Sequence, residues 1–480
     1  MTKIRPASVV AWTRMGRLPA ALVSLGLLGG CASFSPDGGL DKVATITQER
    51  IAAAPQPIRT EQDAARMADE VKRLLAEPLN ADSVVKIAVL NNRGLQADLA
   101  GLGIAEADLV QAGRLRNPIM SFSRTAGGGD VDYERKFLFD LMDLLTLSTR
   151  SEIERRRFEV TQLQVANATL DLAQSARQAF FAAVAAQEAA KHQEELMQAA
   201  EAGAELARRM ADVGNFTRLR QQREQLLYAE ATAELARVRQ NATRERERLT
   251  RLLGLAGVQR HYTLPDRLPD LPATTIPEES VVQQAMDSRL DLRMAKIELT
   301  GLAKSLGLTR ATRFVNVLET SYLNNNAKGG PHMRGYEIEL SLPIFDWGQA
   351  RTAKAEALYT QAMHRVAGMA VDAESEVRDA YSAYRTAYDL ARHHQDEIVP
   401  LRKRISEEIL LRYNGMLIGV WDLLADARQQ VAGINAAIQA KKDFWLADSN
   451  LHMALNGGGA GGVSLTAMSA SSAAESSGGH

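Results

Sequence analysis

Two long stretches of the chain contain no proline, and they constrain the fold more than any other feature. The 480 residues include 14 prolines, but none lies between Pro118 and Pro265 or between Pro343 and Pro400. Proline breaks a helix interior, because it lacks an amide hydrogen and its ring clashes with the preceding turn. The two stretches can therefore form helices much longer than those of an ordinary globular domain.

The composition excludes several classes of function. The formal net charge is −1, whereas a nucleic-acid-binding protein needs a concentrated basic face. A single cysteine rules out a disulfide framework within the chain and a cysteine-rich metal site. His393 and His394 have no further histidine one helical turn away, so they predict no metal site. The sequence contains no phosphate loop, Ser-His-Asp set or HExxH string, and we expect no enzyme, no metal and no dissociable cofactor.

The N-terminus has the features of a secretory signal. Four basic residues precede an apolar segment, and the only cysteine follows in Leu28-Gly29-Gly30-Cys31. This string resembles a bacterial lipobox. The resemblance implies cleavage before Cys31 and a covalent lipid on that residue, with diacylglyceryl and N-acyl groups that hold the protein on a bilayer. Ala32 at the next position implies the outer membrane. The alternative is an ordinary signal peptide with a chance cysteine nearby.

Matches at a similar spacing indicate that the chain is duplicated. Ser83-Val84-Val85 recurs as Ser280-Val281-Val282, Tyr133-Glu134 recurs as Tyr336-Glu337, and Gly214 then matches Gly415. We predict a lipoprotein signal peptide over residues 1–30, an irregular lipidated linker over 31–60 and a first repeat over 61–254. A proline-rich linker over 255–277 then leads into a second repeat over 278–456 and a disordered tail over 457–480.

Each repeat has the same expected order of helix, two strands, very long helix, turn and long helix. In the first repeat we expect a helix over 82–114 that begins at an Asp82 or Ser83 N-cap, and an antiparallel pair over about 149–212 and 215–253. Apolar residues there keep the spacing of a coiled-coil seam, and many are alanine, so neighbouring helices can approach closely. A helix of about 62 residues is about 90 Å long, which does not fit a globular domain.

Two short segments alternate between apolar and polar residues with the period of a β-strand. Residues 336–342 put Glu337 and Glu339 on one face and apolar side chains on the other, and residues 133–141 do so less regularly. Paired with 117–124 and 313–323, they predict two hairpins, near 117–147 and 313–344.

An apolar-out, polar-in alternation is the pattern of a transmembrane barrel wall, with Glu337 and Glu339 lining the lumen. Four strands cannot close a barrel, so a membrane location requires three chains and twelve strands. The alternative is a small soluble hairpin packed on helices.

The segment Leu340-Ser-Leu-Pro-Ile-Phe-Asp-Trp-Gly-Gln-Ala-Arg351 resembles the strand-to-helix junction of the TolC-type outer-membrane efflux proteins, which is usually Pro-Leu-Phe-Asp-Gly-Gly-x-Arg. The junction residues are Pro343, Asp346 and Gly348; the proline ends the strand and the aspartate can cap the next helix. The first repeat departs from the pattern, because residues 140–145 keep only the aspartate, Asp143.

The resemblance covers about residues 61–456 and implies a mainly helical protein with a small transmembrane β part. The expected assembly is a homotrimer with a 12-stranded barrel, four strands per protomer, that continues into a tunnel of long coiled-coil hairpins. It implies a passive conduit of a tripartite efflux system, which receives substrates from a periplasmic adaptor (membrane fusion) protein and an inner-membrane pump and releases them outside.

The implied location is the outer membrane of a Gram-negative bacterium, with a lipid anchor, contact with outer-membrane lipid and a body that extends into the periplasm. The alternative function is a periplasmic coiled-coil scaffold or adaptor lipoprotein without a pore. That alternative explains the long helices and the anchor, but not the duplicated hairpins.

The two helix–helix turns carry the residues expected to contact the adaptor. They are Gly214 and Asn215 in the first repeat and Asn414 and Gly415 in the second. The alternative is that the glycines only end helices.

Asp422 and Asp426 lie one helical turn apart after the second turn. The resemblance implies that Asp422 belongs to the narrow mouth of the tunnel, and we expect both residues to form a gate. Three copies of such aspartates would repel one another, raise one another's pKa and attract cations. The alternative is a solvated helix face or a partner of the helix dipole.

Overall fold

The computed structural model describes residues 33–127, 130–315, 317–327 and 330–457. The predicted signal peptide, Cys31 and all but the first residue of the predicted tail lie outside these ranges. The main helices and strands are, in chain order, α2 (Leu40–Ile51), α3 (Glu61–Leu75), α4 (Ala81–Asn91), α5 (Arg93–Ala112), β1 (Ile119–Gly127), β2 (Asp130–Asp140), α6 (Leu141–Asp212), α7 (Arg218–Leu252), α8 (Val281–Ser288), α9 (Leu290–Ala311), β3 (Leu318–Ala327), β4 (His332–Leu340), α10 (Gln349–His393), α11 (Val399–Asn414) and α12 (Val420–Asn456).

Three shorter segments complete the described secondary structure. One 3-10 turn, η1 (Gly257–Arg260), lies in the proline-rich linker and another, η2 (Glu278–Ser280), follows it directly. A π-helical turn, η3 (His394–Ile398), joins α10 to α11. The chain divides into two compact units. One contains residues 102–159 and 298–361 with the N-terminal segment up to Gly39, and the other contains residues 40–101, 160–297 and 362 onward.

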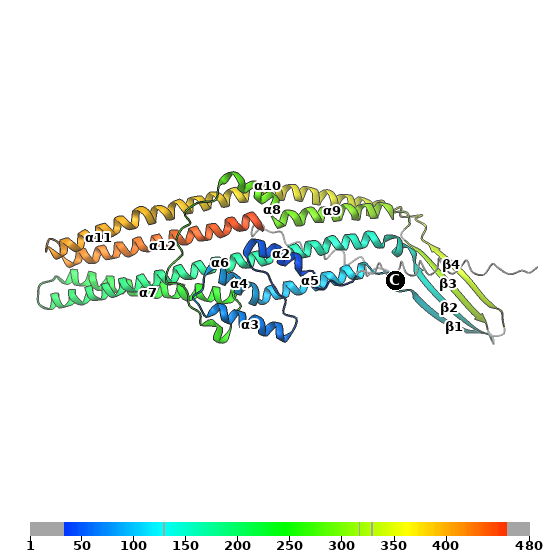
Figure 1. The fold of residues 1–480 in the computed structure, drawn as a ribbon, viewed down its shortest axis with the longest axis horizontal. Coiled ribbons are helices and arrows are strands. Elements are labelled where there is room, and N and C mark those ends of the chain that lie inside the picture. Colours follow the sequence, from blue (N-terminus) through cyan, green and yellow to red (C-terminus); the bar gives the residue numbers. More distant parts are fainter. Residues whose placement is uncertain (1–32, 128–129, 316, 328–329, 458–480) are drawn as a thin grey trace, which may run out of the picture. The chain divides into compact units, whose positions relative to one another are not determined.

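The first unit contains a four-stranded antiparallel sheet in the order β1-β2-β3-β4 (Figure 1). The two hairpins, β1–β2 and β3–β4, meet where β2 pairs with β3, with Phe137 opposite Tyr322. Directly opposed residues share a face of the sheet. The prediction of a mainly helical protein with a small antiparallel sheet is confirmed.

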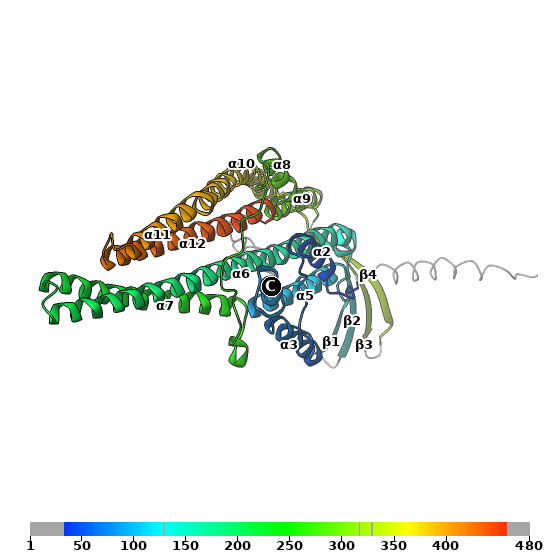
Figure 2. The same cartoon turned by 60° about the vertical axis from the view of Figure 1, so that its left-hand side comes forward.

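The second unit is built from long helices in antiparallel pairs. The α6–α7 pair belongs to the first repeat and the α11–α12 pair to the second (Figure 2). Helix α6 has 72 residues and starts eight residues before the predicted position 149, because it begins directly after β2 with no intervening loop.

Each repeat packs its short helix against its own long helices. In the first repeat Val84 and Ile87 of α4 join Phe180 and Val184 of α6 and Leu249 of α7 in one buried cluster. In the second repeat the short helix is α8, and it packs against long helices in the same way. Its Val281 and Ala285 pack with Tyr384, Tyr388 and Phe444, the last three forming ring contacts.

Three local predictions are wrong. The helix expected over 82–114 is two helices, α4 and α5, and the N-cap is Asn80 rather than Asp82 or Ser83. Asn80 accepts a hydrogen bond from the Ser83 amide at 2.8 Å and the Ser83 hydroxyl accepts one from the Asn80 amide at 2.9 Å, a reciprocal cap. The linker expected to be irregular contains the 12-residue helix α2.

Candidate functional site

The turn between α6 and α7 closes around Gly214. Its backbone φ is +81°, a left-handed value that favours glycine. The Gly214 amide donates to Ala211 O at 3.0 Å and the Asn215 amide donates to Met210 O at 2.9 Å. These two bonds form a Schellman motif, which pairs carbonyls that a helix end otherwise leaves free. Thr217 then caps α7 by accepting a hydrogen bond from the Arg220 amide.

The turn between α11 and α12 has the same hydrogen bonds but a different residue at the left-handed position. The Met416 amide donates to Tyr413 O and the Leu417 amide donates to Arg412 O, both at 2.9 Å. Met416 has a φ of +59°, whereas Gly415 has −79°. The structural counterpart of Gly214 is therefore Met416, and the match to Gly415 inferred from sequence is one residue out of register.

The two turns contact each other within the second unit. The rings of Phe216 and Trp421 stack with their centroids 4.9 Å apart. A Cβ added at Gly203 of α6 would lie 2.8 Å from Leu424 Cδ1, so α6 and α12 approach closely there because residue 203 has no side chain. Arg428 of α12 lies 3.5 Å from the Glu224 carboxylate of α7. The α6–α7 and α11–α12 hairpins thus contact each other near their turns.

Large apolar side chains remain exposed around these turns. Met416 is 92% exposed, and the others are Val213, Leu219, Leu411 and Leu417. Exposed apolar side chains are typical of interaction surfaces, so both turns are candidates for a contact with another protein.

The two aspartates of the expected gate have different surroundings. Asp422 is exposed, and its Oδ2 accepts a hydrogen bond from the Gly419 amide at 3.1 Å, at the start of α12. Asp426 is 6% exposed, and its Oδ2 accepts a hydrogen bond from the Ser406 hydroxyl of α11 at 2.5 Å. Asp426 therefore joins the two helices of the hairpin, while the Asp422 side chain lies at the surface of this chain.

The two faces of the sheet differ in polarity, with Ile119 and Met333 as apolar residues on the more polar face and Arg124, Arg135 and Arg334 as charged residues on the more apolar one. Glu337 and Glu339 of β4 lie on one face, and the Glu337 carboxylate pairs with the Lys136 ammonium of β2 at 2.7 Å across β3. Glu339 is directly opposite Glu319 on the same face. The other face carries exposed aromatic and aliphatic side chains of β1, β2 and β4, namely Met120, Phe122, Phe137, Phe139, Tyr336, Ile338 and Leu340.

The strand-to-helix junction of the second repeat needs its glycine. Gly348 has a φ of +70°, and an added Cβ would lie 2.9 Å from the Arg313 carbonyl oxygen. Asp346 accepts a hydrogen bond from the Gly348 amide at 2.8 Å, just before α10 begins. Pro343 lies three residues after the end of β4.

The first repeat builds its junction without proline or glycine. Asp143 is buried in the first turn of α6, accepts a hydrogen bond from the Arg116 amide at 3.1 Å and pairs with Arg150. Arg116 is the sequence counterpart of Arg313, so the same position contacts the junction in both repeats.

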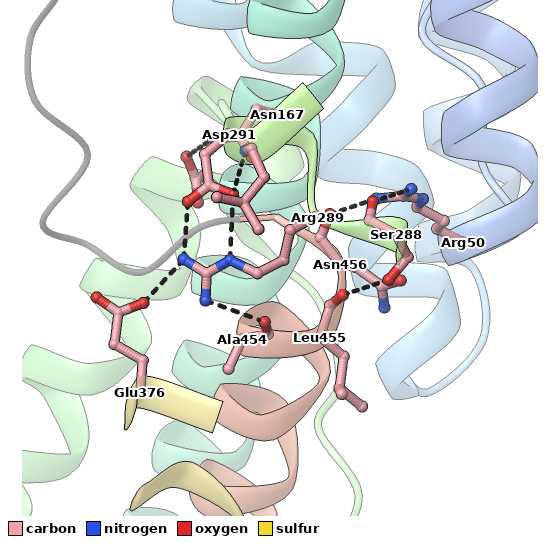
Figure 3. Close-up of polar contacts among 11 residues, drawn as sticks. Arg50, Asn167, Ser288, Arg289, Asp291, Glu376, Ala454, Leu455 and Asn456 are labelled. Atoms are coloured by element: carbon pink, nitrogen blue, oxygen red, sulfur yellow. Dashed lines mark hydrogen bonds and ion pairs between the residues drawn. The ribbon is translucent and has the colours of Figure 1, made fainter. Parts of the chain in front are cut away.

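Figure 3 shows a charged cluster at the end of α12, which we call the clasp: Arg50, Ser288, Arg289, Asp291 and Glu376. Arg289 is 2% exposed and lies at the break between α8 and α9. Its guanidinium pairs with Asp291 at 2.7 Å and with Glu376 of α10 at 2.8 Å. Burial lowers the pKa of Arg289, but these two ion pairs outweigh it, so the pKa lies above its ordinary value.

The clasp caps the last turn of α12. Arg289 donates to the carbonyl of Ala454 at 3.3 Å, the Ser288 hydroxyl donates to Leu455 O at 2.6 Å, and Arg50 donates to Asn456 O. The Met453 carbonyl accepts from the Gly457 amide. All four carbonyls that a helix C-terminus leaves free are thus paired, and the two arginines place positive charge at the negative end of the helix dipole.

The first repeat contains a neutral counterpart of the clasp. Asn91 and Asn92, at the break between α4 and α5, donate side-chain hydrogen bonds to the carbonyls of Leu252, Leu253 and Gly254 at the end of α7. Asn92 and Arg289 are both the C-cap of their short helix. The two repeats therefore share a hydrogen-bonding plan as well as an order of elements.

Within the described ranges, no helix combines the length and the apolar character needed to cross a bilayer. The same part of the chain contains no group of three His, Cys, Asp or Glu residues arranged to hold a metal ion.

Solved structures with the same architecture identify the fold. The CmeC outer membrane channel of Campylobacter jejuni aligns with a TM-score of 0.67 over 78% of this chain and 85% of its own, at 18% identity. The outer membrane protein VceC of Vibrio cholerae aligns with a TM-score of 0.65 over 79% of this chain and 96% of its own, at 16% identity.

The chain has the TolC-type outer-membrane channel fold. A third TolC-type structure, the open state of the MtrE outer membrane channel of Neisseria gonorrhoeae, aligns with a TM-score of 0.63 over 79% of this chain and 89% of its own, at 19% identity. Neither a scan against protein-family models nor a search of curated proteins returned a match.

Some features of this chain were not predicted from its sequence. Arg289 and the Phe216–Trp421 stack were not predicted. For Arg289 the sequence did contain a hint, because the alignment of the two repeats places Arg289 opposite Asn92, and both lie where a short helix breaks. The stack joins residues about 200 positions apart, and no local pattern in the sequence indicates it.

Proposed function

We propose that this protein is an outer-membrane channel, the passive trimeric conduit of a tripartite efflux system. The observation that carries the proposal is the four-stranded sheet, which has an exposed apolar face, a polar face and two unpaired edges in one chain. Its TolC-type fold supports the same function, because the similar structures are described as outer membrane channels.

The apolar face of the sheet fits the hydrocarbon core of a membrane. The ring centroids of Phe122 and Tyr133 lie 6.1 Å apart and those of Tyr322 and Tyr336 lie 5.6 Å apart, near the middle of the strands. At the end of the sheet that leads into the helices, Trp347 and the fully exposed Phe345 follow β4. Exposed aromatic residues at the border of an apolar band are typical of barrels that span a bilayer.

The unpaired edges explain why three copies are needed. Among the residues that the structure describes, no strand pairs with the outer edge of β1 or of β4. In a membrane such edges must be paired, because lipid offers no hydrogen bonds to a bare backbone. We propose that β4 of one copy pairs with β1 of the next, which is antiparallel to it, and that three sheets close a twelve-stranded barrel. Glu337 and Glu339 then line the lumen.

The helix–helix turns form the periplasmic end of the conduit in this proposal. Their exposed apolar side chains, among them Met416 and Leu417, would dock a helical hairpin of the periplasmic adaptor protein, with Gly214, Asn215, Asn414 and Gly415 forming the turns themselves. An inner-membrane pump would supply the substrate. Three Asp422 carboxylates would gather at the tunnel mouth and attract cations, whereas Asp426 would mainly hold α11 on α12.

The lipid anchor completes the proposed location. The lipobox-like sequence before Cys31 supports a diacylglyceryl and N-acyl modification there, and hence attachment to the outer membrane of a Gram-negative bacterium. The alternative is a periplasmic coiled-coil scaffold or adaptor lipoprotein. An exposed apolar sheet face with open edges has no use in that alternative, since it would aggregate in water.

Planar-bilayer recording with purified protein tests the proposed function. The protein is reconstituted while its oligomeric size is measured by light scattering. We expect a trimer that gives discrete conductance steps. If the tip of the wild type is closed, the steps should appear after substitution of Asp422. A monomer with no conductance, in the wild type and in the Asp422 variant alike, would contradict the proposal.

A further inference from the structure

The apolar face of the sheet carries arginines in the half that is nearer the hairpin turns. Arg135 of β2 and Arg334 of β4 lie in one row across the sheet, because both are opposite Asn324 of β3. Arg124 of β1 and His332 of β4 lie together in the next row toward the turns. The three arginines and the histidine are exposed. We call these five residues the basic rim.

The basic rim is compact enough for one ligand to contact several of its side chains. Two strand spacings separate Arg135 from Arg334, which is about 10 Å between their backbones. Arg124 is a diagonal neighbour of Arg135, at about 7–8 Å. Arginine has one of the longest side chains, so the guanidinium groups can converge on a single group that lies between them.

The two faces of the sheet also differ in the sign of their charge. The face opposite the basic rim holds Lys136 and the acids Asp132, Glu134, Asp140, Glu319, Glu337 and Glu339. Among the described side chains of the four strands, no acid lies on the same face as the rim, so none is placed to neutralise it. Arginines that only face water tolerate acids beside them, whereas a surface of one sign favours a partner of the opposite sign.

An unpaired polar atom lies in the middle of the row. Asn324 is between Arg135 and Arg334, and its Oδ1 is buried without a hydrogen-bond partner among the described residues. Buried polar atoms are rarely left unpaired, because their desolvation is then not compensated. A guanidinium that turned inward to hold a ligand would also donate to this oxygen. The unpaired atom therefore favours a ligand held between the two arginines.

We propose that the basic rim binds the anionic phosphate headgroup of a membrane lipid, whose acyl chains lie on the apolar rows beside it. Guanidinium groups match phosphate oxygens in both geometry and charge. The neighbouring row of the same face is aromatic, with Phe137, Tyr322 and Tyr336, and exposed aliphatic side chains of β4 continue it. This surface fits a ligand that combines a phosphate with acyl chains better than it fits a free anion.

The inference rests on the proposed function, because it assumes that this face of the sheet meets lipid. At the end away from the hairpin turns, the strands lead into α6 and α10, which the proposed function places in the periplasm. The basic rim is then on the outer side, and its lipid belongs to the outer leaflet of the membrane. The inference adds a lipid ligand and the residues that select it.

Native mass spectrometry of the purified full-length protein in detergent tests the inference. The probes are phosphatidic acid, which carries a phosphate monoester, phosphatidylcholine with the same acyl chains, and inorganic phosphate. The test variant combines Arg135→Gln with Arg334→Gln. A second variant, Arg135→Lys with Arg334→Lys, keeps the charge but loses the planar fork. The control, Arg378→Gln with Arg412→Gln, removes two exposed charges from α10 and α11.

We expect the wild type to bind phosphatidic acid about tenfold more tightly than phosphatidylcholine, since hydrogen bonds between charged groups are the stronger kind. The glutamine variant should lose most of this preference, the lysine variant should keep part of it, and the control should keep all of it. Inorganic phosphate should bind much more weakly than phosphatidic acid, because it has no acyl chains for the apolar rows.

Equal binding of the two lipids by the wild type would overturn the inference. A preference that survives in the glutamine variant, or that falls as far in the control, would overturn it as well. Binding of inorganic phosphate as tight as that of phosphatidic acid would identify a free anion as the ligand and so overturn it too. Light scattering and bilayer conductance of the same preparations report on the proposed function separately, because a conducting trimer without the lipid preference contradicts only this inference.

Discussion

The Arg289 guanidinium lies 2.8 Å from the Glu376 carboxylate and so joins the break between α8 and α9 to α10. The same guanidinium reaches the last turn of α12 through Ala454 O. One buried side chain therefore connects the start of the second repeat with its end. The clasp fixes the C-terminal end of α12, the helix whose N-terminal end carries Asp422.

Removing the Arg289 side chain should destabilise the protein. Arg289→Ala leaves Asp291 and Glu376 without their cation and frees the Ala454 carbonyl. Breaking a fully buried ion pair costs about 3–5 kcal/mol, and we expect a smaller loss here because the Glu376 side chain is 42% exposed. Arg378→Ala is the control, because its pair with Glu374 on α10 is exposed at both ends and is worth about 0–1 kcal/mol. Chemical denaturation followed by circular dichroism measures both. Equal effects of the two substitutions would contradict the structural role of the clasp.

Met416→Gly should stabilise the turn between α11 and α12. A residue other than glycine in the left-handed region is strained by about 1 kcal/mol, and Met416 is so exposed that its loss removes few contacts. Gly214→Ala should destabilise the other turn by a similar amount, since it introduces the same strain. Thermal unfolding of the purified protein gives both values. A lower melting temperature for Met416→Gly would contradict this expectation and would show that the Met416 side chain makes stabilising contacts with another chain.

Gly348→Ala should damage the junction before α10. The new Cβ would lie 2.9 Å from the Arg313 carbonyl oxygen, and the residue would keep a φ of +70°. We expect a loss of about 2 kcal/mol or more from the combined clash and strain. Gly368→Ala, in the middle of α10 with open space around it, should instead stabilise the helix by up to about 1 kcal/mol. Denaturation curves that rank the two variants the other way would contradict the described junction.

Asp422→Ala and Asp426→Ala should have different effects. Asp422 is exposed, so its removal should reduce cation selectivity or cation block in planar bilayers with little change in stability. Asp426 is buried against Ser406, so its removal should cost about 1–3 kcal/mol and loosen the α11–α12 pair. Unchanged conductance and selectivity in Asp422→Ala would remove this residue from the proposed gate.

Patterns that repeat along the chain predicted the fold well, whereas contacts between residues far apart in the sequence could not be predicted. The absence of proline predicted the long helices, and the alternation around Tyr336 predicted a strand. The helix break at Arg289 has no proline or glycine, because it is stabilised by the Glu376 side chain of α10 and the Ala454 carbonyl of α12, which no local pattern reveals. At the candidate site the two turns were located, but Met416 replaces glycine in the second, since an exposed turn tolerates modest strain.

The most direct test of the central claim is disulfide cross-linking between the open edges of the sheet. In a Cys31→Ser background, one cysteine replaces Ser121 or Ser123 of β1 and a second replaces Gly335, Glu337 or Glu339 of β4, in all pairings. Within one chain these edges are three strand spacings apart, about 14 Å, which is too far for a disulfide. Any bond must therefore join two copies.

We predict that at least one pairing gives, after oxidation in membranes, a covalent ladder on a denaturing gel that ends at three chains. Chains that remain monomeric in every pairing, or a ladder that ends at another number, would contradict a twelve-stranded barrel built from three copies.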